Sequence, residues 1–382
     1  MSTLIVGYAR TPFVKFNGQF KDVPAPALGA HAIRAALSPD AVDHVVAGQV
    51  LQAGVGQNPA RQSAVGAGIP LTVPAITVNA VCLSGMEAVV AGHRLIAAGE
   101  ADVVVAVGQE SMTLAPHALV GSRAGTRYGP ATLVDTLEHD GLTDAFERRS
   151  MGLSTDEVNG RLALTREDQD AFAASSHARL AAADLSGEIA PFTVEGRTPV
   201  TVTEDDGLRA DTTAESLGAL RAAFREGGTI TAGNSSQVTD GAAAIVLVSS
   251  SYAEQHGIAG IARLVSHALV AGPDVSLHSQ PSNAIRAALA RTDHGTGDLA
   301  AVEINEAFAA VGVQSTRDLG VDPAIVNANG GAIALGHPIG ASGTRIVGHL
   351  ARRLAAAGPG SLGAAGICGG GGQGSAVILE AV

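Results

Sequence analysis

Thr77-Val78-Asn79-Ala80 closes a β-rich run, and a short turn through Cys82 then leads into an apolar segment with helical spacing over 84–99. The same order recurs at Ile325-Val326-Asn327-Ala328, where a longer glycine-rich loop precedes a helical segment over 342–356. Each helical segment leads to another strand-like run, over 103–107 in the first case and 362–367 in the second. Chance similarity of short Val-Asn-Ala strings is the alternative, but the matching order of elements favours an internal duplication.

The second copy indicates how the first one is interrupted. We expect 362–367 to pair with 375–380 through a short glycine-rich hairpin, whereas the matching partner of 103–107 is the distant run 241–248. The residues between are therefore predicted to be an insertion into a hairpin. These boundaries predict a first half made of 1–112 and 232–252, an inserted loop domain over 113–231, and a second half over 253–382.

The chain alternates β-rich runs with alanine-rich helical runs, which predicts an α/β fold. Further strands are expected over 3–8, 44–49, 75–79, 261–268, 301–304 and 325–328. Helices are expected over 26–37, 58–67, 84–99, 167–183, 281–291, 306–317 and 342–356.

The composition argues against several classes of function. A net charge of −12 disfavours a nucleic-acid or anionic-membrane surface. Lys15 and Lys21 are the only lysines and no Gly-Lys-Ser/Thr occurs, which excludes a P-loop. Neither a signal peptide nor a membrane-spanning apolar run is evident, so we expect a reduced, cytoplasmic setting. The histidines show no metal-ligand spacing, and no metal site is expected.

The chain has only two cysteines, and both lie where sulfur chemistry is possible. Cys82 precedes a helix, whose unpaired N–H groups and positive dipole end favour a thiolate. Cys368 ends a strand-like run and is followed by Gly369-Gly370-Gly371-Gly372, which allows close approach of a backbone or a ligand. The structural alternative is that a free cysteine is only a small buried hydrophobe.

Two further motifs contain candidate catalytic groups. The loop from Asn329 to Gly343 surrounds His337 with glycines and a proline, and an imidazole held in this way suits a general base. Asn305-Glu306 follows the strand-like run 301–304, at the end of a strand where α/β folds place their sites. The structural alternatives are a histidine that caps a turn and a helix N-cap at Asn305.

Taken together, these segments resemble the thiolase family, and in particular its biosynthetic acetyl-CoA acetyltransferase branch, over essentially the whole chain. The segments that carry the resemblance are Ala9-Arg10-Thr11-Pro12-Phe13, Gly48-Gln49-Val50-Leu51, Gly56-Gln57-Asn58-Pro59, Asn79-Ala80-Val81-Cys82, Gly108-Gln109-Glu110-Ser111-Met112, Asp144-Ala145-Phe146, Thr231-Ala232-Gly233-Asn234-Ser235-Ser236, Asn305-Glu306-Ala307-Phe308, the loop around His337, and Cys368-Gly369-Gly370-Gly371-Gly372.

The resemblance implies a duplicated, five-layered αβαβα fold with an inserted loop domain. It implies that Cys82 is the nucleophile that carries the acyl group, that His337 takes its proton, and that Cys368 removes a proton from C2 of a second acetyl-CoA. Asn305, through a water, and His337 would form one oxyanion hole. The N–H groups of Cys82 and Gly370 would form the other.

The resemblance also implies contacts with coenzyme A, which would be a substrate and product rather than a tightly bound cofactor. The expected contact and tunnel-lining residues are Arg209, Ser236, Leu142, Met151, Phe224, Ala232, Ala307 and Phe308. The family further implies acyl-CoA substrates and a homo-oligomer built as a dimer of dimers.

A few positions depart from the family pattern. Ser150 stands where the biosynthetic branch has a histidine, Leu83 replaces a glycine, and Gln373 replaces a methionine. None of these changes removes a chemical group from the expected mechanism.

Two alternative functions are a decarboxylative condensing enzyme of the ketoacyl-synthase type, which needs no second cysteine, and a non-catalytic CoA- or lipid-binding relative.

Overall fold

The computed structural model describes residues 2–39, 41–125 and 128–382. Before the insertion lie β1 (Thr3–Arg10), β2 (Val14–Lys15), α1 (Ala25–Ala36), β3 (His44–Gly48), α2 (Pro59–Gly66), β4 (Ala75–Val78), α3 (Ser84–Ala97) and β5 (Val103–Glu110). The insertion contains β6 (His117–Ala118), η1 (Ser122–Ala124), β7 (Val134–Asp135), η2 (Leu137–Leu142), α4 (Met151–Asn159), α5 (Arg166–Ala182), β8 (Phe192–Val194), β9 (Val200–Val202) and α6 (Ala214–Gly218). After it come β10 (Thr239–Ser249), α7 (Ser250–His256), β11 (Ala262–Ala271), α8 (Gln280–Leu289), η3 (Thr296–Asp298), β12 (Leu299–Ile304), α9 (Ala309–Leu319), α10 (Ala332–Leu335), α11 (Ser342–Ala357), β13 (Leu362–Gly369) and β14 (Gln373–Ala381).

The strand pairing confirms the duplication. The main sheet runs in the order β12-β13-β14-β11-β1-β10-β5-β3-β4, with β2 paired to β10. Outward from the centre, β1-β10-β5-β3 and β11-β14-β13-β12 show the same sequence of two antiparallel pairs and one parallel pair. β1 and β11 pair with each other over a short antiparallel stretch, which joins the two halves.

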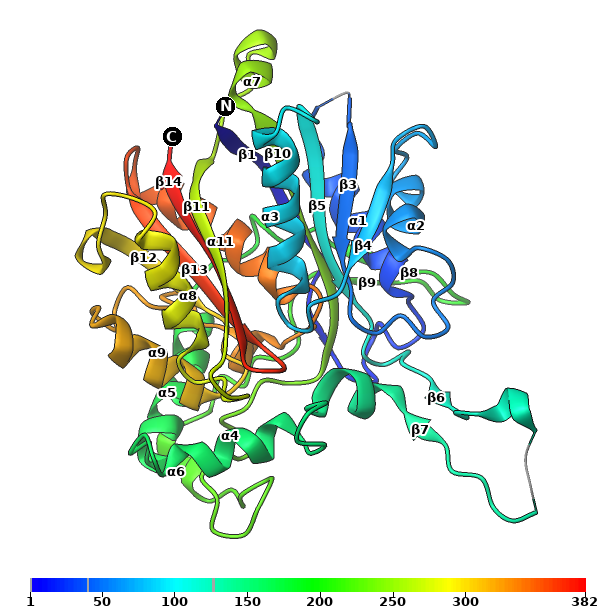
Figure 1. Cartoon of the computed structure of the whole chain (residues 1–382), viewed down its shortest axis with the longest axis vertical. Helices are drawn as coiled ribbons and strands as arrows, with labels where there is room; N and C mark the ends of the chain where they lie inside the picture. Colours follow the sequence, from blue (N-terminus) through cyan, green and yellow to red (C-terminus); the bar gives the residue numbers. More distant parts are fainter. Residues whose placement is uncertain (1, 40, 126–127) are drawn as a thin grey trace.

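The helices complete the five layers that the resemblance implied. α3 and α11 pack against each other between the two halves of the sheet, and each contacts strands of both halves. α1 and α2 cover the outer face of the first half, and α8 covers the outer face of the second half with α9 packed against it (Figure 1). The central helices are buried on nearly all sides, which explains why the apolar residues of 84–99 are not confined to one face.

Glycines allow the two central helices to approach closely. A Cβ atom at Gly343 of α11 would lie 2.3 Å from the backbone nitrogen of Met86 in α3. A Cβ atom at Gly85 would lie 2.7 Å from the carbonyl oxygen of Gly340. The Thr344 hydroxyl donates to the Gly85 carbonyl oxygen at 2.8 Å. This close contact brings the start of α3, next to Cys82, against the start of α11, next to the His337 loop.

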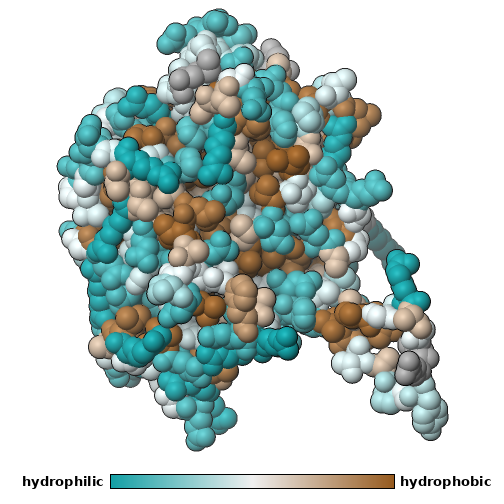
Figure 2. Space-filling model, viewed as in Figure 1, coloured by the Kyte–Doolittle hydropathy of each residue, from teal (hydrophilic) through white to brown (hydrophobic). Residues whose placement is uncertain are grey.

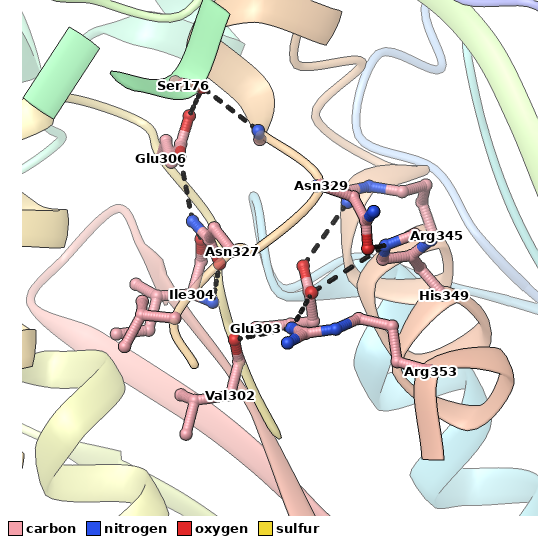
Figure 3. A network of polar contacts seen from close by, with 12 residues as sticks. Ser176, Val302, Glu303, Ile304, Glu306, Asn327, Asn329, Arg345, His349 and Arg353 are labelled. Atoms are coloured by element: carbon pink, nitrogen blue, oxygen red, sulfur yellow. Dashed lines mark hydrogen bonds and ion pairs between the residues drawn. The ribbon is translucent and has the colours of Figure 1, made fainter. Parts of the chain in front are cut away.

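The strand expected over 325–328 is wrong. Val326 forms only an isolated bridge to Val302 of β12. Asn327 adopts a left-handed backbone conformation, and its side-chain amide exchanges two hydrogen bonds of 2.8 Å with the backbone of Ile304 (Figure 3). The guanidinium of Arg179 donates hydrogen bonds to the carbonyl oxygens of Val326 and Asn327. Side chains thus replace the backbone ladder that a strand would have formed.

The helix expected over 306–317 begins three residues later, at Ala309, because Phe308 is extended and bridges Ser235. The short helices α4, α6, α7 and α10 were not predicted. The insertion lies between β5 and β10, which pair side by side, and its β6–β7 hairpin projects from the body as an arm (Figure 1). Across the described residues, no helix combines the length and apolarity needed to cross a membrane.

Candidate active site

The structure brings the predicted catalytic side chains to one cavity of about 420 Å³. Cys82 comes from the turn between β4 and α3, Cys368 from the end of β13, and His337 from the loop between α10 and α11. Both cysteines are buried and unpaired. Each half of the duplicated sheet therefore contributes one sulfur atom to the same cavity, with the imidazole in its wall.

A strained turn holds Cys82 in the cavity wall. Val81 has φ of 53°, a left-handed conformation that a β-branched residue rarely adopts. The Asn79 side chain accepts a hydrogen bond from the Val81 N–H at 3.0 Å, and the Ser84 hydroxyl donates to the Val81 carbonyl oxygen at 2.6 Å. These local contacts offset the strain, and they place the cysteine two residues before Ser84, the first residue of α3.

The Cys82 sulfur is a thiol at neutral pH. Burial raises its pKa to about 12, although hydrogen bonds from the N–H groups of Cys82 and Gly370 act in the opposite direction. The backbone N–H groups favour a thiolate as expected, but desolvation outweighs them, so the pKa of Cys82 is raised overall. Burial, and then the charge of Cys82, raise the pKa of Cys368, which indicates that the two sulfur groups are electrostatically coupled.

His337 is a neutral base in one tautomer. Its Nδ1 lies 2.6 Å from the Ser342 Oγ, which itself donates to the Pro338 carbonyl oxygen at 3.0 Å. The hydroxyl hydrogen is thus engaged, so Nδ1 carries the ring proton and Nε2 keeps its lone pair. Burial, with a smaller contribution from the Arg345 charge, lowers the pKa of the imidazole to about 3. A neutral imidazole with a free Nε2 can accept a thiol proton.

Asn305 lies beside the imidazole. Its Nδ2 is 3.4 Å from the His337 Nε2, and its buried Oδ1 has no hydrogen-bond partner among the described residues. A buried amide oxygen without a partner is costly in a closed protein core. Its presence here indicates a site that is completed by a water or a substrate group.

Most of the predicted tunnel residues line the same cavity: Leu142, Met151, Phe224, Ser236, Ala307 and Phe308. Gly370 adjoins it, because a Cβ atom there would lie 3.2 Å from the Met151 sulfur. Arg209 and Ala232 are exposed and do not line the cavity. The site residues that we missed are Asp135, Leu137, Glu138, Gly152, Ser235, Val238, Leu277, Ile339 and Ser342. Ile339 and Ser342 lie in the quoted His337 loop and Ser235 in the quoted segment 231–236, but the others carry no pattern that could have marked them.

No metal centre is visible in the ranges 2–39, 41–125 and 128–382, where no three His, Cys, Asp or Glu side chains group as ligands. The cavity offers the acid–base and nucleophilic groups described above. Its lining is mostly apolar, with the reactive groups gathered where the loops of the two halves meet.

Comparison with known proteins identifies the family. Residues 3–251 match the thiolase N-terminal domain, and residues 258–381 match the thiolase C-terminal domain. The chain belongs to the thiolase family. It is 51% identical to the "Probable acetyl-CoA acetyltransferase" of Mycolicibacterium smegmatis, over 99% of this chain and 100% of the relative.

Two solved thiolase structures share the whole fold. Human mitochondrial 3-ketoacyl-CoA thiolase superposes with a TM-score of 0.95 at 36% identity, over 100% of this chain and 99% of the other. The Acat5 thiolase from Ascaris suum, solved in complex with coenzyme A, superposes with a TM-score of 0.93 at 36% identity, over 100% of both chains. The duplicated five-layered fold expected from the resemblance is thus confirmed.

Proposed function

We propose that this thiolase transfers acyl groups between CoA thioesters through an S-acyl intermediate on Cys82. In one direction it condenses two acetyl-CoA molecules to acetoacetyl-CoA and CoA, and in the other it cleaves a 3-ketoacyl-CoA with CoA. The observation that carries the proposal is that Cys82, Cys368 and His337 share the wall of one cavity. The names of the relatives, acetyl-CoA acetyltransferase and 3-ketoacyl-CoA thiolase, agree with the two directions.

In the first half-reaction, the Cys82 sulfur attacks the thioester carbonyl while its proton passes to the His337 Nε2. The C–S bond to coenzyme A then breaks, and the departing sulfur takes the proton back from the imidazole. A buried neutral thiol beside a buried neutral imidazole suits this step, because no ion pair has to be maintained before the substrate arrives. Donor and product are both thioesters, so the acyl group moves between species of similar energy.

In the second half-reaction, the Cys368 thiol gives its proton to the neutral His337 Nε2, and the Cys368 sulfur then removes a proton from C2 of the second acetyl-CoA. The resulting carbanion attacks the acyl carbonyl on Cys82 and expels the Cys82 sulfur, which takes the proton from the imidazolium. Burial is the main cause of the raised pKa of Cys368, so its thiolate forms only when a base accepts the proton.

Both half-reactions develop negative charge on a carbonyl oxygen, and two sets of donors are available. One set is Asn305, acting through a water, together with His337 once it is protonated. The other is the N–H groups of Cys82 and Gly370, which hydrogen-bond the Cys82 sulfur. Loss of one donor from such a set costs on the order of 10²–10³ in rate.

The cavity favours short acyl chains. A volume of about 420 Å³ has to hold the end of the pantetheine arm as well as the acyl group. Phe224 and Phe308 meet edge to face with their ring centres 6.1 Å apart, which gives this part of the tunnel an apolar wall. We assign Ser236 and the exposed Arg209 and Ala232 to coenzyme A, which enters and leaves as substrate and product.

The assembly that we propose is a cytoplasmic dimer of dimers. Its subunit consists of a first half (1–112 and 232–252), a second half (253–382), and an insertion (113–231) that covers coenzyme A. Two separate surfaces support two kinds of subunit contact. β4 is an edge strand of the main sheet with Ile76 exposed, and the β6–β7 arm exposes Val120 and Leu133. Figure 2 shows hydrophobic residues on the arm that projects from the body.

The proposal is tested by trapping the intermediate. Wild-type protein mixed with radiolabelled acetyl-CoA should carry the label on Cys82, and Cys82→Ser should lose thiolysis of acetoacetyl-CoA while it keeps its circular dichroism spectrum. A non-catalytic binder would bind CoA without taking up label, and a decarboxylative enzyme would need a malonyl thioester. Wild-type rates in the Cys82→Ser variant would show that the assignment is wrong.

A further inference from the structure

Two buried carboxyl groups hold the loop that carries His337, one on each side of the imidazole. Glu110 is the last residue of β5, in the first half of the fold, and Glu306 follows β12, in the second half. Neither carboxyl group is reached by solvent. The reaction steps proposed above use neither group, although each belongs to a segment that marks the family resemblance.

Glu110 binds the part of the loop that follows His337 in the chain. Its Oε2 accepts hydrogen bonds from the backbone N–H groups of Gly340 and Val50, both at 3.0 Å, and its Oε1 accepts from the Leu51 N–H at 3.2 Å. One carboxyl group therefore ties the His337 loop to the segment that follows β3. Gly340 has to be glycine for this contact, because a Cβ atom there would lie 2.8 Å from the Glu110 Oε2.

Glu306 binds the part of the loop that precedes His337 in the chain. Its Oε2 accepts from the Ile333 N–H at 3.1 Å and from the Ser176 hydroxyl at 2.7 Å, and its Oε1 accepts from the Asn327 amide at 2.8 Å (Figure 3). The Ser176 oxygen in turn accepts from the Gly331 N–H at 3.0 Å. A Cβ atom at Gly331 would lie 2.3 Å from the Glu306 carboxyl carbon, so this glycine is also required by a carboxyl group.

We propose that Glu110 and Glu306 are positioning residues that clamp the loop at Gly340 and Ile333, and thereby fix the His337 imidazole in the cavity that it shares with the two cysteines. The loop's glycines expose backbone N–H groups, and the two carboxyl groups satisfy them where water cannot reach. One of the two carboxyl groups comes from each half of the fold. The position of His337 is therefore fixed relative to both halves, which also supply the two sulfur atoms. This inference rests on the proposed role of His337.

If the substitutions displace the base, the rate should fall by more than it would if they only destabilised the fold. A displacement of about 1 Å in a catalytic group can cost on the order of 10²-fold in rate. Glu110→Leu and Glu306→Leu keep the approximate volume of the side chain but leave the loop N–H groups without acceptors. We expect each variant to slow alkylation of Cys82 by iodoacetamide at neutral pH by about 10-fold to 10²-fold, with thiolysis reduced in kcat more than in KM.

The deciding experiment is a double-mutant cycle with His337→Ala, read out as the rate of Cys82 alkylation. In the His337→Ala background, Glu110→Leu and Glu306→Leu should cause no decrease, because no imidazole is left to misplace. Asp43→Leu is the control. This carboxylate accepts hydrogen bonds from the N–H groups of Asp102 and Val103, at the end of β3 and β5 opposite to Glu110. It should lower the melting temperature without slowing alkylation.

Several outcomes would overturn the proposal. A decrease of similar size in both backgrounds would mean that the carboxyl groups only support the fold, and no decrease in the wild-type background would mean that they do not position the base. If the leucine variants do not fold, Glu110→Gln and Glu306→Gln carry the same cycle, since each keeps one accepting oxygen and should show a smaller loss. Wild-type thiolysis by His337→Ala alone would instead refute the proposed function.

Discussion

Replacement of His337 by asparagine should make the stability of the protein less sensitive to acid. The imidazole is buried and its pKa is lowered from 6.5 to about 3. Below pH 6.5 the unfolded chain binds a proton at this position, whereas the folded protein does not until the pH falls to about 3. The folded state binds fewer protons, so stability is fully present above pH 6.5 and is lost progressively as the pH falls.

The size of this loss follows from the interval between the two pKa values. One pH unit corresponds to about 1.4 kcal/mol, so the histidine should cost about 2 kcal/mol of unfolding free energy between pH 7 and pH 5. Asparagine does not titrate, and its amide can still donate to the Ser342 hydroxyl. His177, His267 and His278 also have pKa values lowered to about 4 by burial, but they titrate equally in both proteins and cancel in the difference.

The assay is urea unfolding at pH 7 and pH 5, followed by circular dichroism at one protein concentration for both proteins. The variant has its own stability at pH 7, but its loss on moving to pH 5 should be smaller than that of the wild type by about 2 kcal/mol. Identical losses would refute the reasoning, because they would mean that the imidazole takes up its proton in the folded protein as readily as in the unfolded chain.

Two further substitutions test other parts of the site. Ser342→Ala removes the acceptor of the His337 Nδ1 proton and allows the other tautomer, so kcat for thiolysis should fall by about 10-fold to 10²-fold. Ser342→Thr keeps the hydroxyl and should keep most of the activity. Equal kcat in the two variants would count against the assigned tautomer. Gly343→Ala puts a Cβ atom 2.3 Å from the Met86 nitrogen and should lower the unfolding free energy by about 1–3 kcal/mol. Gly160→Ala, where a Cβ atom meets nothing within 4 Å, is the control and should be neutral or stabilising in the same denaturation assay.

Much of the fold could be predicted because it depends on patterns that repeat along the chain. The order of turn, helix and strand that follows 77–80 recurs after 325–328, and the observed pairing of β10 with β5 and of β14 with β13 follows that repeat. The prediction failed where side chains took over backbone hydrogen bonds. Asn327 and Arg179 satisfy the groups that a strand at 325–328 would have used, and no local pattern marks such contacts.

The reactive residues themselves could also be recognised in the sequence, since two cysteines and one histidine lie in unusual glycine-rich or helix-start surroundings. Their protonation states could not. A helix start and a glycine loop are local features, but the pKa values of Cys82 and His337 are dominated by burial, which depends on residues far away in the chain. For the same reason the clamps from Glu110 and Glu306 became visible only in the folded molecule, where segments more than 20 positions apart supply the donors and the acceptors of single hydrogen bonds.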